Sequence, residues 1–393
     1  MKKIYSTVIV SLLVATAAQA QLTISNGNHV MEISGSASTY YNQRILKEGE
    51  YDHSKDRFKL RDAQLSIEGR VSNIWEYKLQ ADLADMSANT SSGEIDPENP
   101  GLMDASVTYK GLGFLDIKAG YGKVPYSLSS MVPFTFSPYW QRAELTRGSL
   151  FSRRDAGVTL HSSLWRQRVN LYAGVYSGLG EMALIGDNDA SGNPEFIGRA
   201  EFSYPARYRY RLIDDRHSPI PMFMIGVNGR YMNKTLPDGE VFPANTQSEY
   251  GMKVIDGKKY VYGFDVSFMY QGFSAQFEMH QIKGEPAKTN DPLFMGYTPQ
   301  QTHGYFLAGG YIAEVNYHIA PINTIVSARY EELDLNDLAK GNSQRFSPAV
   351  AYQIKGFDAM VKFQYFNILK EETTYDALKW KEQYRLGIQF NFN

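Results

Sequence analysis

The sequence predicts an all-β fold, a transmembrane antiparallel β-barrel of about sixteen strands whose third outer loop folds inward. Three observations lead to this prediction. Apolar and polar residues alternate with a period of two in many short segments, aromatic residues reach 13% of the chain while charged residues reach only 21%, and short links alternate with long ones. A closed barrel needs apolar side chains only on its outer face, so it requires no long apolar run.

The alternation of polarity identifies the strands. In WEYKLQADL, which starts at Trp75, every odd position is apolar and every even position is polar. The same split recurs in residues 115–121, 168–175, 273–280, 358–365 and 383–392. Successive side chains of a strand point to opposite faces, so each segment is predicted to turn an apolar face outward and a polar face toward the interior.

The lengths of the links decide between a membrane barrel and a soluble sandwich, because both alternate in polarity. Tight links are predicted at residues 71–74, 111–113, 163–166, 271–272, 320–321 and 355–356. Long polar links lie at residues 85–102, 124–152, 179–195, 233–257, 283–303, 334–343 and 370–379. This alternation is typical of an outer-membrane barrel with short periplasmic turns and long outer loops. Residues 205–219 fall where a short turn is expected, and either a small helix or an extended turn fits them.

A barrel of about sixteen strands leaves an aqueous lumen, whereas about eight strands would be filled by side chains. The long link at residues 124–152 contains VPYSLSSMVPFTFSPYW, which is rich in proline and aromatic residues. Such side chains are poorly placed in open water, so this loop is predicted to fold into the barrel. The alternatives are a loop that lies over the rim or joins contacts between subunits. Aromatic residues at strand ends are expected at the membrane interfaces, namely Trp75, Tyr109, Tyr121, Trp165, Tyr317 and Trp380.

The first residues predict export. Lys2 and Lys3 precede an apolar run that ends in Ala18-Gln19-Ala20, so residues 1–20 are expected to form a signal peptide and residues 21–393 a single barrel domain. The chain has no cysteine, which excludes disulfides and thiolate zinc sites, and its formal charge of -2 makes nucleic acid an unexpected partner. The seven histidines are scattered and no nucleophile motif frames them, so no catalytic residue, metal site or cofactor is predicted.

Several motifs resemble the phosphate-selective porin O and P family. They are FKLRDAQLSIEGRV from Phe58, DASVTYKGLGFLDIKAGYGKVPYSL from Asp104, and SLFSRRDAGV from Ser149. The resemblance implies a sixteen-stranded, trimeric channel of the bacterial outer membrane. It also implies that the third outer loop constricts the pore and that lysine and arginine line the path of an anion. Membrane lipid and lipopolysaccharide, small anions or other solutes, and two further copies of the chain are the expected partners.

Seven residues are the candidates for lining the pore and binding anions. Lys123 matches the family lysine in GYGKVP, and Arg153 and Arg154 match the basic position where the loop rejoins the next strand. The remaining candidates are two loop cations and two cations on lumen-facing positions, Arg142, Arg147, Lys118 and Arg168. Counting back from the lipid-facing Val158 places Arg153 in the lumen and Arg154 at the rim. In the structural alternative, an arginine of this pair only fastens the loop by pairing with Asp155 or Glu144.

The lumen-facing positions carry about as many acids as bases, for example Asp62 and Glu68 beside Lys78 and Arg70. This mixed wall leaves more than one function open. The preferred hypothesis is a diffusion channel for small hydrophilic solutes, with anions such as phosphate favoured. The alternatives are a general or carbohydrate porin without anion selectivity, and a surface barrel that serves adhesion or anchoring.

Overall fold

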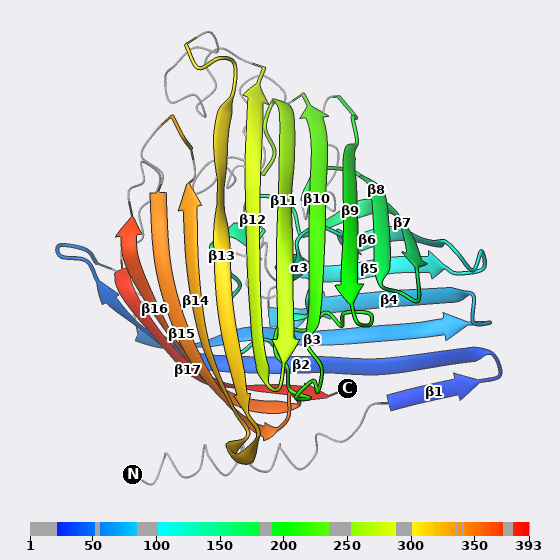
Figure 1. Ribbon diagram of the computed structural model, residues 1–393, viewed down its shortest axis with the longest axis horizontal. Coiled ribbons are helices and arrows are strands. Elements are labelled where there is room, and N and C mark those ends of the chain that lie inside the picture. Colours follow the sequence, from blue (N-terminus) through cyan, green and yellow to red (C-terminus); the bar gives the residue numbers. More distant parts are fainter. Residues whose placement is uncertain are drawn as a thin grey trace.

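The described residues form a closed antiparallel barrel of sixteen strands, β2 to β17, with one further strand, β1, at the N-terminal side (Figure 1). The computed structural model describes residues 22–51, 56–84, 101–148, 150–180, 191–235, 253–287, 301–334, 336–338, 342–371 and 380–392. The predicted signal peptide, residues 1–20, lies outside them. The fold class predicted from the sequence is confirmed, and so is the alternation of short and long links.

The strands follow one another along the chain. Their bounds are β1 Leu22–Asn26, β2 His29–Leu46, β3 Asp56–Val71, β4 Trp75–Asp82, β5 Leu102–Tyr109, β6 Asp116–Lys123, β7 Arg154–Leu164, β8 Val169–Tyr176, β9 Glu195–Tyr204, β10 Met222–Lys234, β11 Gly257–Tyr270, β12 Phe273–Pro286, β13 Phe306–Ile319, β14 Thr324–Asp334, β15 Asn342–Lys355, β16 Ala359–Glu371 and β17 Trp380–Phe392. Short helical turns are α3 Leu128–Met131, η1 Phe134–Phe136, η2 Glu144–Thr146 and η6 Ala320–Ile322. No helix in the described part of the chain is long and apolar enough to cross a bilayer.

The barrel closes between its first and last strands. β2 pairs with β3 on one side and with β17 on the other, and β9 pairs with β10. The pairing of β17 with β2 ends at Phe392 opposite Gly35, and β1 then pairs with β2 from Leu22 opposite Ile33. The N-terminal hairpin therefore occupies the edge of β2 that β17 leaves open.

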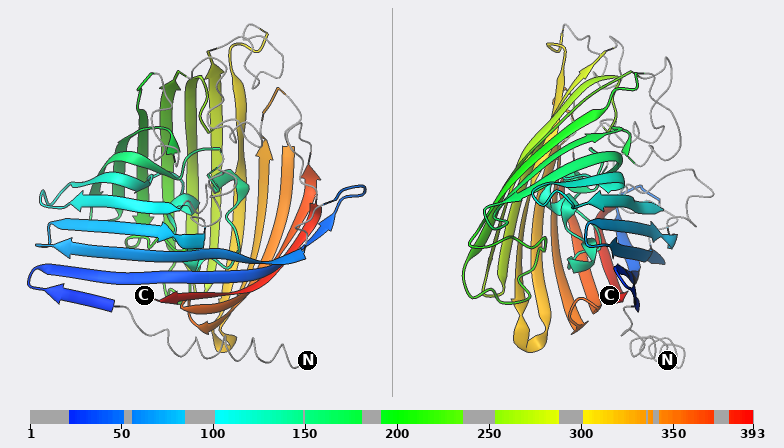
Figure 2. Two further views of the ribbon diagram at one scale, coloured as in Figure 1. Left: turned by 180° about the vertical axis from the view of Figure 1, so that it is seen from behind. Right: turned by 90° about the vertical axis from the view of Figure 1, so that its right-hand side faces the viewer.

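The predicted outward and inward faces are visible in the exposure of side chains. In β10, Ile225 and Val227 are exposed while Asn228 and Arg230 are buried. The strands of the wall differ in length, because β4, β5, β6 and β8 have 8 residues each whereas β10 to β17 have 11 to 14. In Figures 1 and 2, β2, β3 and β4 run at a steep angle to β10, β11, β12 and β13.

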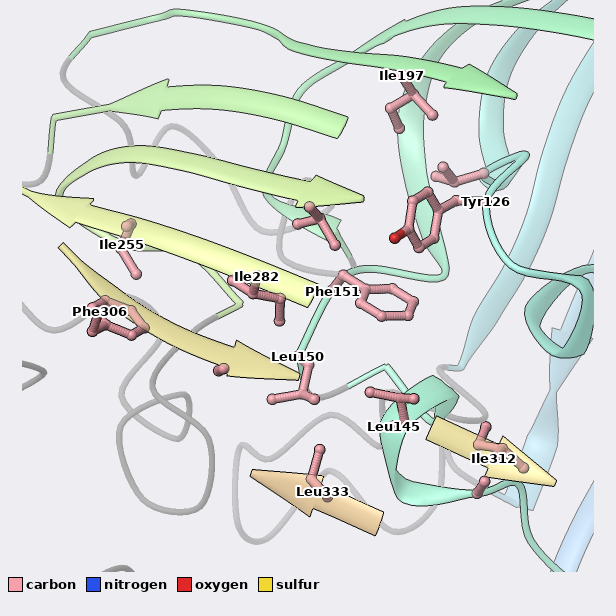
Figure 3. Close-up of a cluster of buried hydrophobic side chains, with 14 of the residues drawn as sticks. Tyr126, Leu145, Leu150, Phe151, Ile197, Ile255, Ile282, Phe306, Ile312 and Leu333 are labelled. Carbon is pink, nitrogen blue, oxygen red and sulfur yellow. The ribbon is translucent and has the colours of Figure 1, made fainter. Parts of the chain in front are cut away.

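Residues 124–152, called the inner loop below, fold into the barrel as predicted. Tyr126, Leu128 and Trp140 are at most 1% exposed. Apolar side chains of the inner loop pack against inward-facing residues of the wall, such as Ile282 on β12 and Ile312 on β13 (Figure 3). One side of the lumen is thus filled by a hydrophobic core, whose burial removes apolar surface from water. The alternative of a loop lying over the rim is wrong.

Residues 205–219, called the inner turn below, also enter the barrel, from the end that carries the short turns. They form an extended turn without a helix. Leu212 and Ile213 are buried in a second cluster together with Leu128 and Val132 of the inner loop. Tyr208 is 4% exposed and donates a hydrogen bond to the carbonyl of Arg211 at 2.8 Å, and burial raises its pKa, so its hydroxyl stays protonated. The lumen is narrowed from both ends.

Candidate pore constriction

A cavity of about 360 Å³ remains open between the inner loop and the wall formed by β2, β3 and β4. Its lining includes six cationic and three acidic side chains, Arg61, Lys78, Lys123, Arg142, Arg153, Arg154, Glu32, Asp62 and Glu68. Small polar residues such as Ser34, Ser36 and Ser66 complete the strand side, and Phe134 and Phe136 belong to the loop side. The described lining therefore carries an excess of positive charge.

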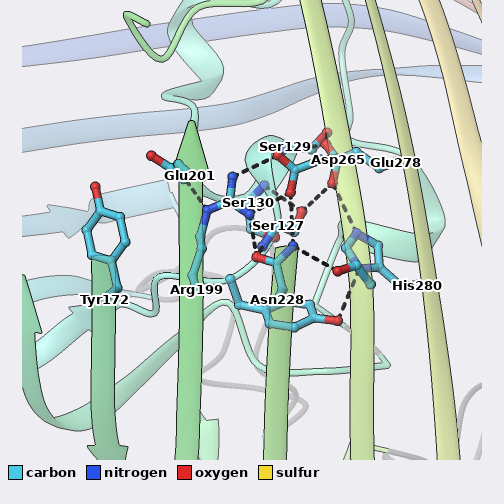
Figure 4. Close-up of polar contacts among 12 residues, drawn as sticks. Ser127, Ser129, Ser130, Tyr172, Arg199, Glu201, Asn228, Asp265, Glu278 and His280 are labelled. Atoms are coloured by element: carbon cyan, nitrogen blue, oxygen red, sulfur yellow. Dashed lines mark hydrogen bonds and ion pairs between the residues drawn. The ribbon is translucent and has the colours of Figure 1, made fainter. Parts of the chain in front are cut away.

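The acids of the opposite wall are used in fastening the inner loop. Glu278 on β12 accepts hydrogen bonds from the hydroxyl of Ser127 at 2.7 Å, from the amide of Ser129 at 2.7 Å and from the hydroxyl of Ser129 (Figure 4). His280 lies 3.1 Å from the same carboxylate, and the Tyr126 hydroxyl lies 3.1 Å from the other ring nitrogen of His280. This buried network holds the beginning of the inner loop against β12.

Other charges of that wall form closed ion pairs. Arg199 makes a two-nitrogen contact with Asp265 and a further contact with Glu201, and all three side chains are at most 2% exposed. Arg230 binds Glu195 through both Nε and Nη2, at 2.8 and 2.7 Å. Such bidentate pairs neutralise one another where they lie. They consequently contribute little net charge to the open cavity.

A second fastening holds the end of the inner loop. The Glu144 carboxylate accepts a hydrogen bond from Arg345 on β15 at 2.9 Å, and its backbone amide donates to Glu331 on β14 at 2.7 Å. Arg147, predicted as a pore cation, lies 3.6 Å from Glu144 and is absent from the cavity lining. The loop is thus attached to the wall near both of its ends.

Two of the cavity cations are held by uncharged groups. Lys123 donates to the carbonyl of Met131 at 3.0 Å, and Arg142 donates to the carbonyls of Ser129 and Val132. These carbonyls lie at the C-terminal end of α3, where backbone acceptors lack partners within the helix. The hydrogen bonds position both side chains without adding a negative formal charge.

Arg61 and Phe134 contact each other in the lining. The Arg61 guanidinium lies 4.1 Å from the centroid of the Phe134 ring, and Arg142 lies 5.2 Å from it. Arg61 also donates to the carbonyl of Trp140 at 2.7 Å and contacts Asp62 at 2.5 Å. Aromatic faces attract cations, so Phe134 keeps two arginines close together.

Arg153 and Arg154 both line the cavity, and each is 2% exposed. Arg154 lies 4.0 Å from the carboxylate of Asp104 on β5, a contact beyond hydrogen-bond length. Its Nε and Nη1 have no hydrogen-bond partner within the described residues. The prediction that Arg154 lies at the rim is wrong, because this side chain is turned toward the interior.

The family model described as phosphate-selective porin O and P matches residues 37–208. Residues 37–208, somewhat less than half of the chain, are therefore similar to this porin family. The matched segment begins within β2 and contains β3, β4, the whole inner loop and all six cavity cations. No curated protein sequence shows significant similarity to the chain.

Solved porin structures share the fold of the whole chain. DcaP of Acinetobacter baumannii, an outer membrane channel, is 14% identical, with a TM-score of 0.57 over 95% of this chain and 100% of that one. OprB of Pseudomonas putida is 10% identical, with a TM-score of 0.56 over 92% and 94%. OmpT of Vibrio cholerae is 11% identical, with a TM-score of 0.55 over 94% and 100%. The chain therefore shares the barrel fold of these proteins.

Not all of the predicted porin residues meet at the constriction. Lys123, Arg142, Arg153 and Arg154 line the cavity, whereas Arg147, Lys118 and Arg168 do not. Lys118 stays on the β6 wall near Gly122, and Arg168 packs over the ring of Tyr204 at the short-turn end. The expected interfacial positions of Tyr121 and Trp380 are also wrong, because these side chains are only 4% and 7% exposed.

Two β-bulges explain what the strict alternation of the porin strands missed. The register between β2 and β3 shifts at Arg61, so Arg61 and Asp62 both face the interior. The register between β4 and β5 shifts at Met103, and Met103 and Asp104 are both buried. A bulge adds a residue to one strand and re-aims its side chain. Arg61 lines the cavity, but strict alternation does not predict it as a site residue.

The chemistry of the cavity is set by its charged side chains. Within the described residues no group of three or more His, Asp or Glu side chains is arranged to hold a metal ion. The cations stand in a narrow space whose other walls are protein, and low-dielectric walls strengthen the field of such charges. This arrangement can concentrate and guide anions.

Proposed function

We propose that this protein is a diffusion pore of the bacterial outer membrane that favours small anions, with phosphate among them. The observation that carries the proposal is the separation of charges inside the barrel. Carboxylates of the β9 to β14 side fasten the inner loop or close ion pairs, while the described lining of the open cavity keeps six cations against three acids. An anion entering the cavity meets a net attraction, and rings of lysine and arginine are the usual device of anion pores.

Phosphate fits this lining because guanidinium groups bind its oxygens in pairs. Arg61, Arg142 and Arg154 present such groups to one cavity. Glu32 and Glu68 in the same lining favour the second candidate, a general porin without strong selectivity. Export by a signal peptide at residues 1–20 and contact with lipopolysaccharide are further parts of the proposal.

The test is a single-channel measurement in a planar bilayer with a salt gradient, followed by added phosphate. We expect a reversal potential of the sign that indicates anion preference, and a decrease in chloride conductance when phosphate competes. A cation-selective reversal potential that phosphate does not alter would refute the anion preference. The absence of any conductance would refute the pore.

The short strands β4, β5, β6 and β8 support a homotrimer. A strand of about 8 residues, tilted by about 45°, rises only about 19 Å, which is less than the apolar band of about 25 Å on outer-membrane barrels. β4, β5, β6 and β8 have this length. Contact with another copy would cover these four strands, so the bilayer would not have to become thinner beside them.

We expect the purified protein in mild detergent to have three times the mass of one chain by light scattering. Val107→Arg on β5 should reduce it to monomers, because a charge would enter the interface between copies. Val326→Arg on β14, one of the longer strands, is the matched control, since Val107 and Val326 are both exposed, at 46% and 38%. A monomeric wild-type protein, or equal dissociation by both variants, would contradict the trimer.

A further inference from the structure

The inner turn carries a histidine that meets a histidine of the wall. The Nε2 atom of His217 lies 3.1 Å from the Nδ1 atom of His318, which stands near the end of β13. The ring centroids are 5.1 Å apart and the ring planes meet at 65°. Because one nitrogen must donate and the other must accept, the contact requires that at least one ring be neutral.

The site around His217 is built to hold this geometry. The backbone of His217 has a φ of 51°, a left-handed conformation that is unfavourable for a residue with a side chain. Its ring lies against Gly272 in the turn between β11 and β12, where a Cβ would stand 2.7 Å from the His217 Cε1 atom. Only glycine leaves room for the ring at that position, and Gly272 also has a positive φ of 86°.

The neighbouring charged groups do not offset the electrostatic repulsion between two protonated rings. On the inner turn, Asp214 already accepts hydrogen bonds from the amide and hydroxyl of Ser218 and from the amide of Gly272. Asp215 is paired with Arg211 at 2.9 Å, and Arg216 is exposed. The groups near His318 are the carboxylates Asp214 and Asp215, His217 itself and, on β15, the uncharged Gln353. One imidazolium is tolerated there, whereas two would repel.

We propose that the His217–His318 pair is an acid-sensitive latch that holds the inner turn in the lumen and loosens it when both rings are protonated. Histidine is the side chain that changes its charge between about pH 5 and 8. Outer-membrane barrels carry their short turns on the periplasmic side, so in that orientation the latch responds to acid in the periplasm. Loss of the contact also releases His217 from its left-handed backbone conformation, which favours movement of the turn out of the lumen.

Hydrogen exchange of residues 205–218, corrected for the intrinsic effect of pH on exchange, tests the latch independently of conduction. Between about pH 7.5 and pH 5, wild-type protection should fall by roughly threefold to tenfold, the equivalent of one net hydrogen bond. In a double variant, His217→Gln and His318→Asn, the change should stay under about twofold, because the two amides keep polar atoms near Nε2 and Nδ1 and do not titrate. His29→Gln, at the exposed start of β2, is the matched control and should behave as the wild type.

Single-channel conductance is the second measurement, and this test of the latch rests on the proposed pore function. Acid on the short-turn side should raise single-channel conductance in the wild type and not in the double variant. A wild-type inner turn whose protection does not change with pH would overturn the latch, as would an equal change in the double variant. A channel that does not conduct, with the exchange result intact, would refute the pore and leave the latch standing.

Discussion

Replacing Arg153 and Arg154 together by glutamine should lower the anion-to-cation permeability ratio by about tenfold or more, because the anion loses an attraction and the cation loses a repulsion. Both side chains line the open cavity and are buried there. A unit charge about 5 Å from a passing ion contributes about 0.8 kcal/mol even at the dielectric constant of water, so the loss of two charges changes the energy of an anion by about 1.6 kcal/mol. Reversal potentials in a gradient of potassium chloride measure the ratio.

The control for this experiment is the double variant Arg166→Gln and Arg168→Gln. It removes the same charge from the turn between β7 and β8, outside the cavity lining, and should leave the permeability ratio within about twofold. Salt supplies a further check, because the screening length falls from about 10 Å at about 0.1 M to about 3 Å at about 1 M. An effect that does not weaken in concentrated salt would show that the arginines act by fastening the loop and not by their field.

The single variants test the ranking of the two arginines. Alternation along the strand places only Arg153 in the lumen, and it predicts a larger loss of anion preference for Arg153→Glu than for Arg154→Glu. With both side chains at the cavity, we expect the two losses to be similar. A strong effect confined to Arg153 would support the strict alternation.

Glu278→Ala should loosen the inner loop and raise the single-channel conductance, with frequent transitions between levels. The substitution leaves the hydroxyls of Ser127 and Ser129, the amide of Ser129 and the ring of His280 without their acceptor. Each buried polar group left unsatisfied costs about 1–3 kcal/mol, so the fastening at β12 should lose several kcal/mol. The barrel itself should still form, because the pairing of β12 with β11 and β13 does not involve this side chain.

The matched control is Glu76→Ala. Glu76 pairs with Lys110 at 2.7 Å, but both side chains are well exposed, at 47% and 36%, and such pairs contribute only about 0–1 kcal/mol. We expect this variant to keep the wild-type conductance and thermal midpoint. Identical conductance in Glu278→Ala and the wild type would mean that the loop holds its position through its apolar core alone.

The barrel could be predicted from the sequence because its signals are local. The period of two follows from strand geometry, and the length of each link is visible directly. The inward course of the inner loop was also predictable, since proline and aromatic residues such as Trp140 need a buried place. Arg142 was predicted as a cation of that loop, and Lys123 was predicted from the resemblance of GYGKVP to the family motif.

The details of the constriction depend on features that alternation does not encode. A bulge at Arg61 reverses the face of one residue, and no pattern in FKLRDAQ marks the position. On β6, Tyr121 is buried although it follows the parity of lipid-facing residues, and the register there is continuous. Apolar residues that face inward, such as Ile282 and Ile312, became recognisable only with the loop core that covers them.

The N-terminal hairpin has a consequence for how the chain reaches the closed barrel. Until β17 meets β2, the edge of β2 exposes unpaired backbone groups, and such an edge invites pairing with another chain. β1 covers the part of this edge from Val30 to Ile33 through contacts that are local in sequence. Local contacts form early, because little loop entropy opposes them. The hairpin thus protects the N-terminal part of the β2 edge against aggregation during assembly and leaves free the longer part, Gly35 to Leu46, with which β17 must pair.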